Sequence, residues 1–309
     1  MALPKNQPRP SAKIGPALLK QRVAWSKTFG SAKGPLDLSL AVVSYNQWPV
    51  SERFIQSLGH PQAPARSELL WVDNASTDGS AKRLRAVDWK GLGGFSRITV
   101  LLLKQNYFIS GAVNTALAAA KGRYFIQADN DVLFAPGSLA SYLHALGGRP
   151  GALISPLWQL TQGLLPPDFE PGCYGDLDRA FARIRRANHW LREEHGSAAG
   201  SCWGSDTATI KALGGWSEDY KLQCMDDDMI LRWRQSGRPA GMLPLPVFHP
   251  GLKTRRADRH ASDWELADVA LFRERWQGKG LGALRAPRPW ANRILSSPLA
   301  KLLRALRVF

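Results

Sequence analysis

Two aspartates one residue apart, Asp129 and Asp131, follow an apolar run with the sequence YFIQA. Hard carboxylate oxygens at this spacing are suited to Mg²⁺ or Mn²⁺. A cation held there together with a diphosphate would neutralise charge on a departing nucleoside diphosphate. Pairs of this kind are also common in solvated turns and helix caps. The apolar run favours the metal site, because it places the pair at the mouth of a buried strand.

Three consecutive aspartates, Asp226, Asp227 and Asp228, form a second acidic cluster within CMDDDMILRWRQSG. Like charges this close raise the pKa of one carboxyl group, which is one way to prepare a general base. The alternative is a solvated helix N-terminus, where the helix dipole favours acidic side chains. His249 follows an apolar stretch and precedes Pro250. A neutral imidazole at that point could complete a metal site, although a lone histidine is more often structural.

Polar residues also follow two earlier apolar runs. In VDNASTDGS, Asp73 ends an expected strand, where its carboxylate can accept hydrogen bonds from a base N–H or a ribose hydroxyl. Asp78 is of a type that caps helices, and capping is a sufficient role for it. In QNYFISGAVNTALAAAKG, Asn106, Gly111 and Asn114 precede or begin an expected helix. Free N–H groups at such a helix start suit phosphate or sugar, whereas packing is the alternative role of Gly111.

The elements that position these residues are short apolar runs alternating with helical patterns. This alternation predicts an α/β fold with a Rossmann-like, mostly parallel sheet and helices on both faces. Ligands bind at the carboxyl ends of the strands in such sheets, where Asn46, residues 73–78 and residues 129–131 then converge. The expected strands are 38–45, 67–73, 96–103 and 123–132, and the expected helices are 17–29, 49–58, 80–87, 110–121 and one opened by Pro136.

Composition limits the class of protein. The chain has 309 residues, enough for one large α/β domain with extensions or for two small domains. No apolar run approaches the roughly 18 residues of a membrane-spanning helix, and no secretory leader is expected. The three cysteines are widely spaced, which disfavours a zinc site or a disulfide framework and fits a reducing cytosol.

The net charge of +16 is concentrated at the two ends of the chain. Residues 1–36 and residues 279–309 each contain seven lysines and arginines and no acid, so the middle holds 27 basic and 25 acidic residues. Near the C-terminus, four leucines at helical spacing alternate with basic residues, as in a basic amphipathic surface helix. These arms indicate docking to an anionic membrane or to a nucleic acid, with solvated tails as the alternative.

In their order along the chain, these segments resemble the inverting family 2 glycosyltransferases, which have the GT-A fold. The resemblance covers roughly residues 37–252 and implies a nucleotide-sugar donor and Mn²⁺ or Mg²⁺. It makes Asp129, Asp131 and His249 the expected metal ligands, with Asp131 the direct one. The residues implied to bind the nucleotide sugar are Tyr45, Asn46, Asp73, Asn74, Asp78, Asn106, Gly111, Asn114, Asp129 and Asn130.

The same resemblance implies a catalytic base in the second acidic cluster. Met225 stands where the family commonly has glutamate, so the base is either Asp226 or Asp227, with Asp226 slightly favoured. Gly215 and Trp216, together with Asp228, are expected on the acceptor side. Phe108 is a second departure, because the family commonly has glycine at that position.

The predicted function is metal-dependent inverting transfer of a sugar to an acceptor hydroxyl. A lipid-linked or cell-surface glycan is the expected acceptor, met by a peripheral enzyme on the cytoplasmic face of a membrane. The alternatives are glycosylation of hydroxyl-bearing modified bases in DNA and a non-catalytic sugar-nucleotide or glycan-binding module. The expected organisation is an N-terminal extension (1–36), a GT-A domain (37–278, donor half 37–135 and acceptor half 136–278) and a C-terminal extension (279–309).

Overall fold

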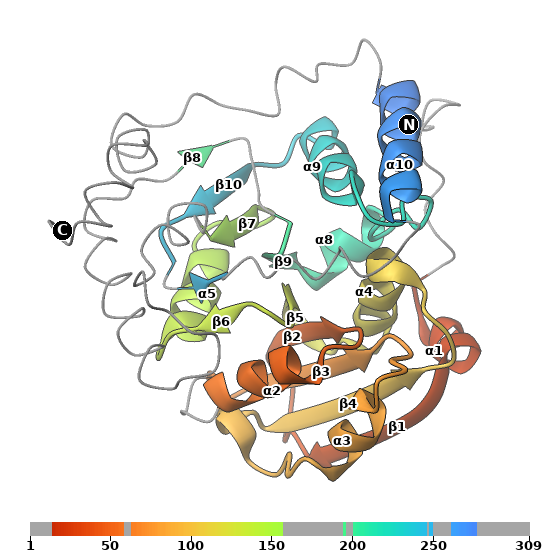
Figure 1. The fold of residues 1–309 in the computed structure, drawn as a ribbon. Coiled ribbons are helices and arrows are strands. Elements are labelled where there is room, and N and C mark those ends of the chain that lie inside the picture. Colours follow the sequence, from red (N-terminus) through yellow and green to blue (C-terminus); the bar gives the residue numbers. More distant parts are fainter. Residues whose placement is uncertain are drawn as a thin grey trace, which may run out of the picture.

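The structure is a computed structural model, and it describes residues 14–58, 63–156, 194–195, 200–245, 247–249 and 261–276. Nine strands form the central sheet, in the order β1-β4-β3-β2-β5-β9-β7-β10-β8 (Figure 1). Helices lie on both faces of this sheet, as the alternation of strands and helices predicts. The α/β fold class expected from the sequence is confirmed.

Four neighbouring strands form the parallel part of the sheet. They are β2 (Leu36–Ser44), β3 (Ser67–Asp73), β4 (Arg97–Leu103) and β5 (Gly122–Asp129), and β2 pairs in parallel with both β3 and β5. The helices between them are α2 (Trp48–Ser57), α3 (Ser80–Ala86) and α4 (Phe108–Ala119), with a short 3₁₀ turn, η1 (Leu92–Gly94), before β4. Parallel strands end at one edge of a sheet, so the polar segments after β2, β3 and β5 lie along that edge.

The second half of the sheet is mixed. Strand β9 (Cys202–Asp206) runs antiparallel to β5, and β10 (Ala240–Leu243) runs parallel to β7 (Leu153–Pro156). The remaining elements of this half are β8 (Glu194–His195), α5 (Ser138–Gly147), α8 (Thr207–Ala212), α9 (Met225–Gln235) and α10 (Ala261–Trp276), and β6 (Leu133–Phe134) pairs with β11 (Val247–Phe248) in a separate small sheet. Helices α9 and α10 lie next to each other (Figure 1).

The N-terminal segment differs from the expectation. The expected helix over 17–29 ends early, because α1 spans only Pro16–Arg22 and is followed by β1 (Val23–Gly30). Strand β1 pairs antiparallel with β4 and forms one edge of the sheet. Residues 16–30 therefore belong to the domain and not to an extension. Lysine on an edge strand, here Lys27, is a common device against pairing with a further chain.

The core lies on both faces of the parallel strands. Leu38, Leu40 and Val42 of β2 pack on one face, while Ala41 and Val43 pack on the other. Strands buried on both faces read as continuous apolar runs without alternation, which is the pattern of LSLAVVSY. Within the described part of the chain, no helix is both long enough and apolar enough to cross a bilayer. The C-terminal arm and residues 157–193 lie outside the described residues.

Candidate active site

The small second sheet brings two predicted metal ligands together. Strand β11 pairs with β6 so that Phe248 is opposite Leu133, and this register carries His249 to the turn that contains Asp131. The imidazole Nε2 of His249 lies 3.2 Å from Oδ2 of Asp131, and both side chains are largely buried. These two groups are 118 positions apart in the sequence, and the structure places them in one site at the carboxyl edge of the sheet.

Asp129, the third expected metal ligand, is hydrogen-bonded within β5. Its Oδ1 accepts a hydrogen bond of 2.8 Å from Nε2 of Gln127, which lies two residues earlier on the same face of β5. Asn130 donates to Oγ of Ser51 on α2. Among the described residues, no three His, Cys, Asp or Glu side chains gather where they could hold a metal ion.

Two protein ligands nevertheless suit a divalent cation of this kind. Mg²⁺ keeps several waters and commonly binds one or two carboxylates together with substrate phosphates. Mn²⁺ accepts carboxylate, water and imidazole ligands as well. The pair formed by Asp131 and His249 therefore fits a cation whose remaining ligands come from a diphosphate and from water.

The turn after β3 is tied to the end of β2. Asp73 is only 1% exposed, and it accepts hydrogen bonds from both the backbone N (3.0 Å) and the Oγ (2.6 Å) of Ser76. Burial raises the pKa of Asp73, and the hydrogen bonds from Ser76 act in the opposite direction. Asn46 donates its backbone N–H to Oγ of Ser76 and accepts from the backbone N of Thr77. Asp73, expected to contact a base or ribose, thus shapes the turn through Ser76.

The exposed part of this region is aromatic. Tyr45 at the end of β2 is 46% exposed, and it is one of two large hydrophobic side chains in the described residues with such exposure. Asp78 accepts hydrogen bonds from the backbone N of Ser80 (3.0 Å) and of Trp48 (3.3 Å). Slight burial opposes the effect, but these hydrogen bonds lower the pKa of Asp78. Asp78 therefore organises the starts of two helices, and Tyr45 is the group free to stack on a ligand.

Asn74 fastens the start of α4 to the end of β3. Its Nδ2 donates to Oδ1 of Asn106 and to the carbonyl of Phe108, and its Oδ1 accepts from the backbone N of Tyr107. Phe108 has a φ of 55°, in the left-handed region that favours glycine. This backbone conformation explains why glycine suits the position and marks Phe108 as a strained exception.

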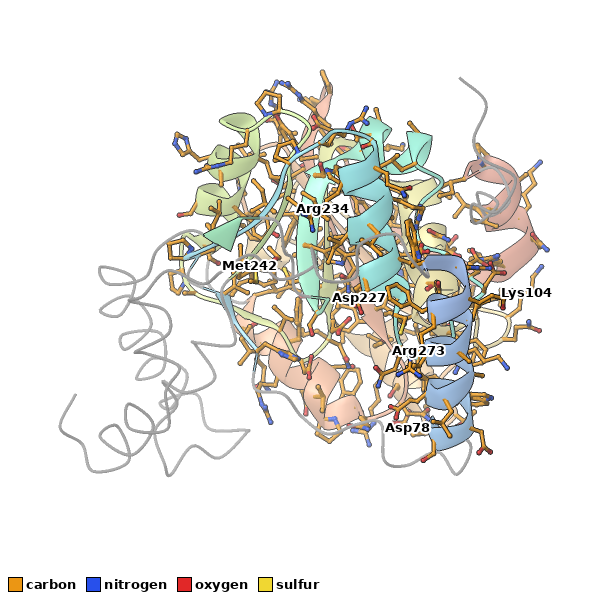
Figure 2. All side chains as sticks on the ribbon, turned by 90° about the horizontal axis from the view of Figure 1, so that it is seen from above. Asp78, Lys104, Asp227, Arg234, Met242 and Arg273 are labelled. Carbon is orange, nitrogen blue, oxygen red and sulfur yellow. The ribbon has the colours of Figure 1, made fainter. Side chains whose placement is uncertain are left out.

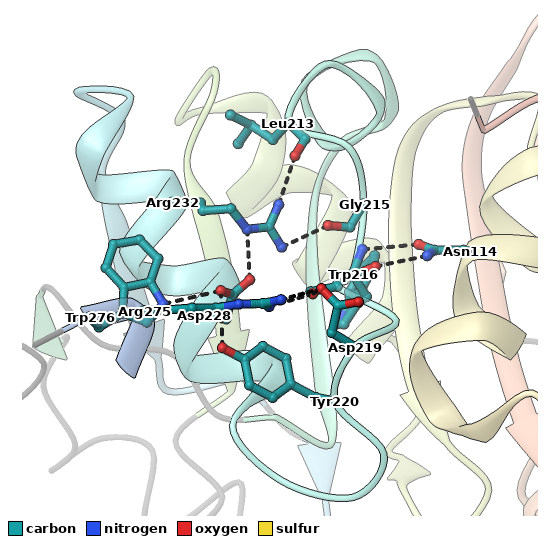
Figure 3. A network of polar contacts seen from close by, with 11 residues as sticks. Asn114, Leu213, Gly215, Trp216, Asp219, Tyr220, Asp228, Arg232, Arg275 and Trp276 are labelled. Carbon is teal, nitrogen blue, oxygen red and sulfur yellow. Dashed lines mark hydrogen bonds and ion pairs between the residues drawn. The ribbon is translucent and has the colours of Figure 1, made fainter. Parts of the chain in front are cut away.

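Four predicted site residues form an internal network instead of a ligand surface. Asn114 is fully buried, donates to the carbonyl of Trp216 and to Glu218, and accepts from the backbone N of Trp216 (Figure 3). Trp216 is itself buried and makes an edge contact with Trp203 at 4.8 Å between ring centroids. Asn114 and Trp216, expected to contact donor or acceptor, thus hold one another in place.

The two glycines of this network allow close packing. An added Cβ at Gly215, where φ is 66°, would overlap the side chains of Asn114 and Ile14. At Gly111, an added Cβ would lie 2.7 Å from Cβ of Tyr107 and 3.2 Å from Arg22. Both glycines are buried, so packing is the role the structure gives them in place of the expected contacts with ligands.

The side chains of the three aspartates in the second cluster differ in burial. Asp228 is 0% exposed, pairs with Arg232 at 2.7 Å and accepts from Nε1 of Trp276 at 3.1 Å (Figure 3). The carboxylate expected on the acceptor side is thus enclosed between α9 and α10, where its contacts are structural. Asp227 is exposed on α9, which lies next to the helix that carries Arg273 (Figure 2).

Asp226 lies against the start of β9. An added Cβ at Gly200 would overlap the carboxylate of Asp226, so that group rests directly on the Gly200 backbone. The next residue, Ser201, accepts a hydrogen bond from the backbone N of Asp129. Asp226 is thus placed beside the end of β5, whereas Asp227 faces solvent. Both remain candidates for the base, and the position of Asp226 favours it.

Helix α10 contributes to the site in a way that the sequence analysis missed. Asp268 is buried and accepts hydrogen bonds of 2.7–3.0 Å from the backbone N–H groups of Lys221, Leu222 and Gln223, just before α9. Trp264 makes an edge contact with Phe108, with ring centroids 5.3 Å apart. Trp264, Asp268, Phe272 and Trp276 recur every four residues, and one acid in such an apolar stripe was the signal for a buried carboxylate.

The fold is an α/β sheet similar to that of GT-A glycosyltransferases. A sequence model of the family described as glycosyl transferase family 2 matches residues 39–200, more than half of the chain. The chain therefore belongs to glycosyl transferase family 2. A comparison with curated proteins finds no match.

Solved structures share the fold at low sequence identity. The mannosyltransferase PcManGT from Pyrobaculum calidifontis, in complex with GDP-Man and Mn²⁺, has a TM-score of 0.54 and 20% identity, over 89% of this chain and 78% of that one. GalNAc-T7 with UDP, GalNAc and Mn²⁺ has a TM-score of 0.52 and 14% identity, over 81% of this chain and 53% of that one. S. aureus TarS has a TM-score of 0.51 and 14% identity, over 79% of this chain and 44% of that one. These likenesses show the fold, and the chain spans about half the length of the last two.

Proposed function

We propose that the protein transfers a sugar from a nucleotide-sugar donor to an acceptor hydroxyl, with inversion at the anomeric carbon, and that Mn²⁺ or Mg²⁺ assists the transfer. The observation that carries this proposal is the pairing of Asp131 with His249 at the carboxyl edge of the parallel sheet. When bound there, a divalent cation would neutralise charge on the diphosphate of the donor. The likeness to proteins solved with GDP-Man or UDP and Mn²⁺ supports the same donor class.

The nucleoside would lie over the turn after β3. Tyr45 offers an exposed ring for stacking on a base, and the backbone of residues 75–77 is held in place by Asp73 and Asn46. Stacking of a base on an aromatic ring tolerates different bases, so Tyr45 would not select one nucleotide. Asn74 and Asn106 support the turn through their mutual hydrogen bond.

A carboxylate at the start of α9 would act as the general base. In one displacement, Asp226 or Asp227 takes the proton of the acceptor hydroxyl while its oxygen bonds to the anomeric carbon. The bond from that carbon to the diphosphate breaks at the same time, through an oxocarbenium-like state. The backbone around Gly200 holds Asp226 near the end of β5, on the side of the sheet edge where the donor would lie.

The acceptor we propose is a lipid-linked or cell-surface glycan. The support is the basic amphipathic pattern between residues 299 and 307, which is typical of helices that lie on anionic membranes. Binding to vesicles that contain anionic lipid, with no comparable binding to duplex DNA, is the expected result. Preferential, salt-dependent binding to DNA would instead favour transfer to modified bases.

A panel of nucleotide sugars tests the proposed activity. We expect one donor to be hydrolysed or transferred in the presence of Mn²⁺, and we expect both chelation and the Asp131→Ala substitution to abolish turnover. Asp226→Asn and Asp227→Asn then identify the base, since only one of them should lower turnover by about 10²-fold or more. No turnover of any donor with intact nucleotide binding would indicate a binding module.

A further inference from the structure

A buried arginine, Arg53, lies near the site of Asp131. Arg53 lies on α2 and is 8% exposed, although it carries a charged guanidinium group. Its Nε has no hydrogen-bond partner among the residues that the structure describes. Buried polar groups are nearly always hydrogen-bonded, so an unpartnered donor of this kind needs an explanation.

The surroundings of Arg53 direct it to the predicted metal site. On the same helix, Ser51 accepts a hydrogen bond from Asn130, and Phe54 packs edge-on against Phe134 at 6.0 Å between ring centroids. These two contacts fix α2 against both ends of the turn that contains Asp131. Burial lowers the pKa of Arg53, and the charge of Asp131 acts in the opposite direction. The charge of the Asp131 carboxylate, which pairs with His249, therefore acts on the Arg53 guanidinium.

A count of charges identifies the kind of ligand that this arrangement lacks. Arg53 and Asp131 together are neutral, and a divalent cation on Asp131 would leave an excess of two positive charges. The diphosphate of a nucleotide sugar carries about two negative charges, which would cancel this excess. A guanidinium also matches phosphate oxygens geometrically, because its planar N–H groups can donate two parallel hydrogen bonds.

We propose that Arg53 is a donor-binding residue whose guanidinium donates hydrogen bonds to the diphosphate of the nucleotide sugar. This inference rests on the proposed function, because it assumes that the donor lies at Asp131. It adds a cationic protein ligand from α2 to a site otherwise formed by the turns after β3 and β5. The role is binding of the leaving group, and it is distinct from proton transfer by the acids of α9.

The alternative is a structural role, in which Arg53 only balances the charge of Asp131. The two roles differ in what the ligand-free protein does. If Arg53 serves the ligand, its replacement by an apolar side chain of similar length removes an unsatisfied buried donor, and Tm stays the same or rises. If Arg53 is structural, the same replacement lowers Tm.

The test compares Arg53→Met and Arg53→Lys with the control Arg66→Met. Arg66 lies just before β3, and its exposed side chain is paired with Asp37. Affinities for UDP and GDP are measured by calorimetry with Mn²⁺, and those for uridine and guanosine by NMR titration. We expect Arg53→Met to weaken binding of the favoured diphosphate about tenfold to hundredfold, with nucleoside affinity and Tm kept. Arg53→Lys should recover part of the loss, and Arg66→Met should match the wild type.

Three results would overturn the inference. Wild-type diphosphate affinity in Arg53→Met would show that Arg53 does not touch the diphosphate, and the proposed function would stand. A lower Tm with equal losses for diphosphate and nucleoside would show a structural role. If the wild type bound neither diphosphate, the proposed function itself would fail, and the inference would fail with it.

Discussion

Replacing Asp228 with alanine should destabilise the fold, because this carboxylate has a structural role. The carboxylate is fully buried and pairs with Arg232, whose own side chain is 12% exposed. Its removal leaves a nearly buried guanidinium without a counter-ion and leaves Nε1 of Trp276 without its acceptor. Breaking a buried ion pair in this way costs about 3–5 kcal/mol of unfolding free energy. Arg232 keeps its bonds to two backbone carbonyls, so we expect the lower end of that range.

Urea unfolding followed by tryptophan fluorescence measures this loss. A change of about 3 kcal/mol corresponds to a decrease in Tm of roughly 6–12 °C for a domain of this size class. Asp227→Ala is the matched control, because Asp227 is the exposed neighbour on the same helix, and it should change stability by less than about 0.5 kcal/mol. The double substitution Asp228→Leu with Arg232→Met should recover most of the loss, since it removes both charges. A loss below about 1 kcal/mol in Asp228→Ala would show that the buried pair of Asp228 and Arg232 does not stabilise the fold in this way.

Three further predictions concern the supports of the site. Asp268→Asn keeps the shape of the side chain but weakens its hydrogen bonds to the three N–H groups before α9. We therefore expect kcat to decrease about tenfold to hundredfold, with the affinity for nucleotide unchanged in calorimetry. Equal losses in kcat and in affinity would contradict the positioning role. Gly215→Ala should lower the unfolding free energy by about 2–4 kcal/mol in urea titrations, because both its positive φ and the lack of space oppose a side chain. The control is Gly137→Ala, which has a positive φ but open space and should cost no more than about 2 kcal/mol. Similar losses in the two variants would argue against the packing at Gly215. Burial, followed by the charges of nearby aspartates, raises the pKa of Cys224 to about 11. In a Cys173→Ser background, iodoacetamide labelling of Cys224 should therefore be slow at pH 8 and should increase as the pH approaches 11, while the stability contributed by the neutral thiol is lost between about pH 9 and 11. Fast labelling at pH 8 would contradict this environment.

The parallel strands and their polar ends could be predicted because local signals define them. Strands buried on both faces read as apolar runs, and the polar residues that follow each run must lie at one edge. Residues 1–36 were expected to form an extension, whereas β1 pairs at the edge of the sheet, and its largely exposed residues do not form the continuous apolar run of a buried strand. Its pairing with β4 is a long-range contact that no local pattern records.

Some site residues could likewise be predicted from local spacing, and others could not. Asp226, Asp227 and Asp228 cannot share one role, because successive residues on a helix point about 100° apart. The spacing of Asp228 from Met225 and from Arg232 placed it on the inner face, and this signal was available in the sequence. The meeting of Asp131 and His249 was not available from periodicity, since β6 and β11 have two residues each. Only the family resemblance pointed to that pair.

The proposed metal site of Asp131 and His249 can be tested by titration. Binding of Mn²⁺ is measured in the presence of saturating UDP or GDP for the wild type, for Asp131→Asn and for His249→Gln. We expect one Mn²⁺ per chain in the wild type, with affinity lower by about tenfold or more in each variant, because each would lose one of the two ligands that the protein supplies. Wild-type affinity for Mn²⁺ in Asp131→Asn would show that Asp131 does not hold the metal ion.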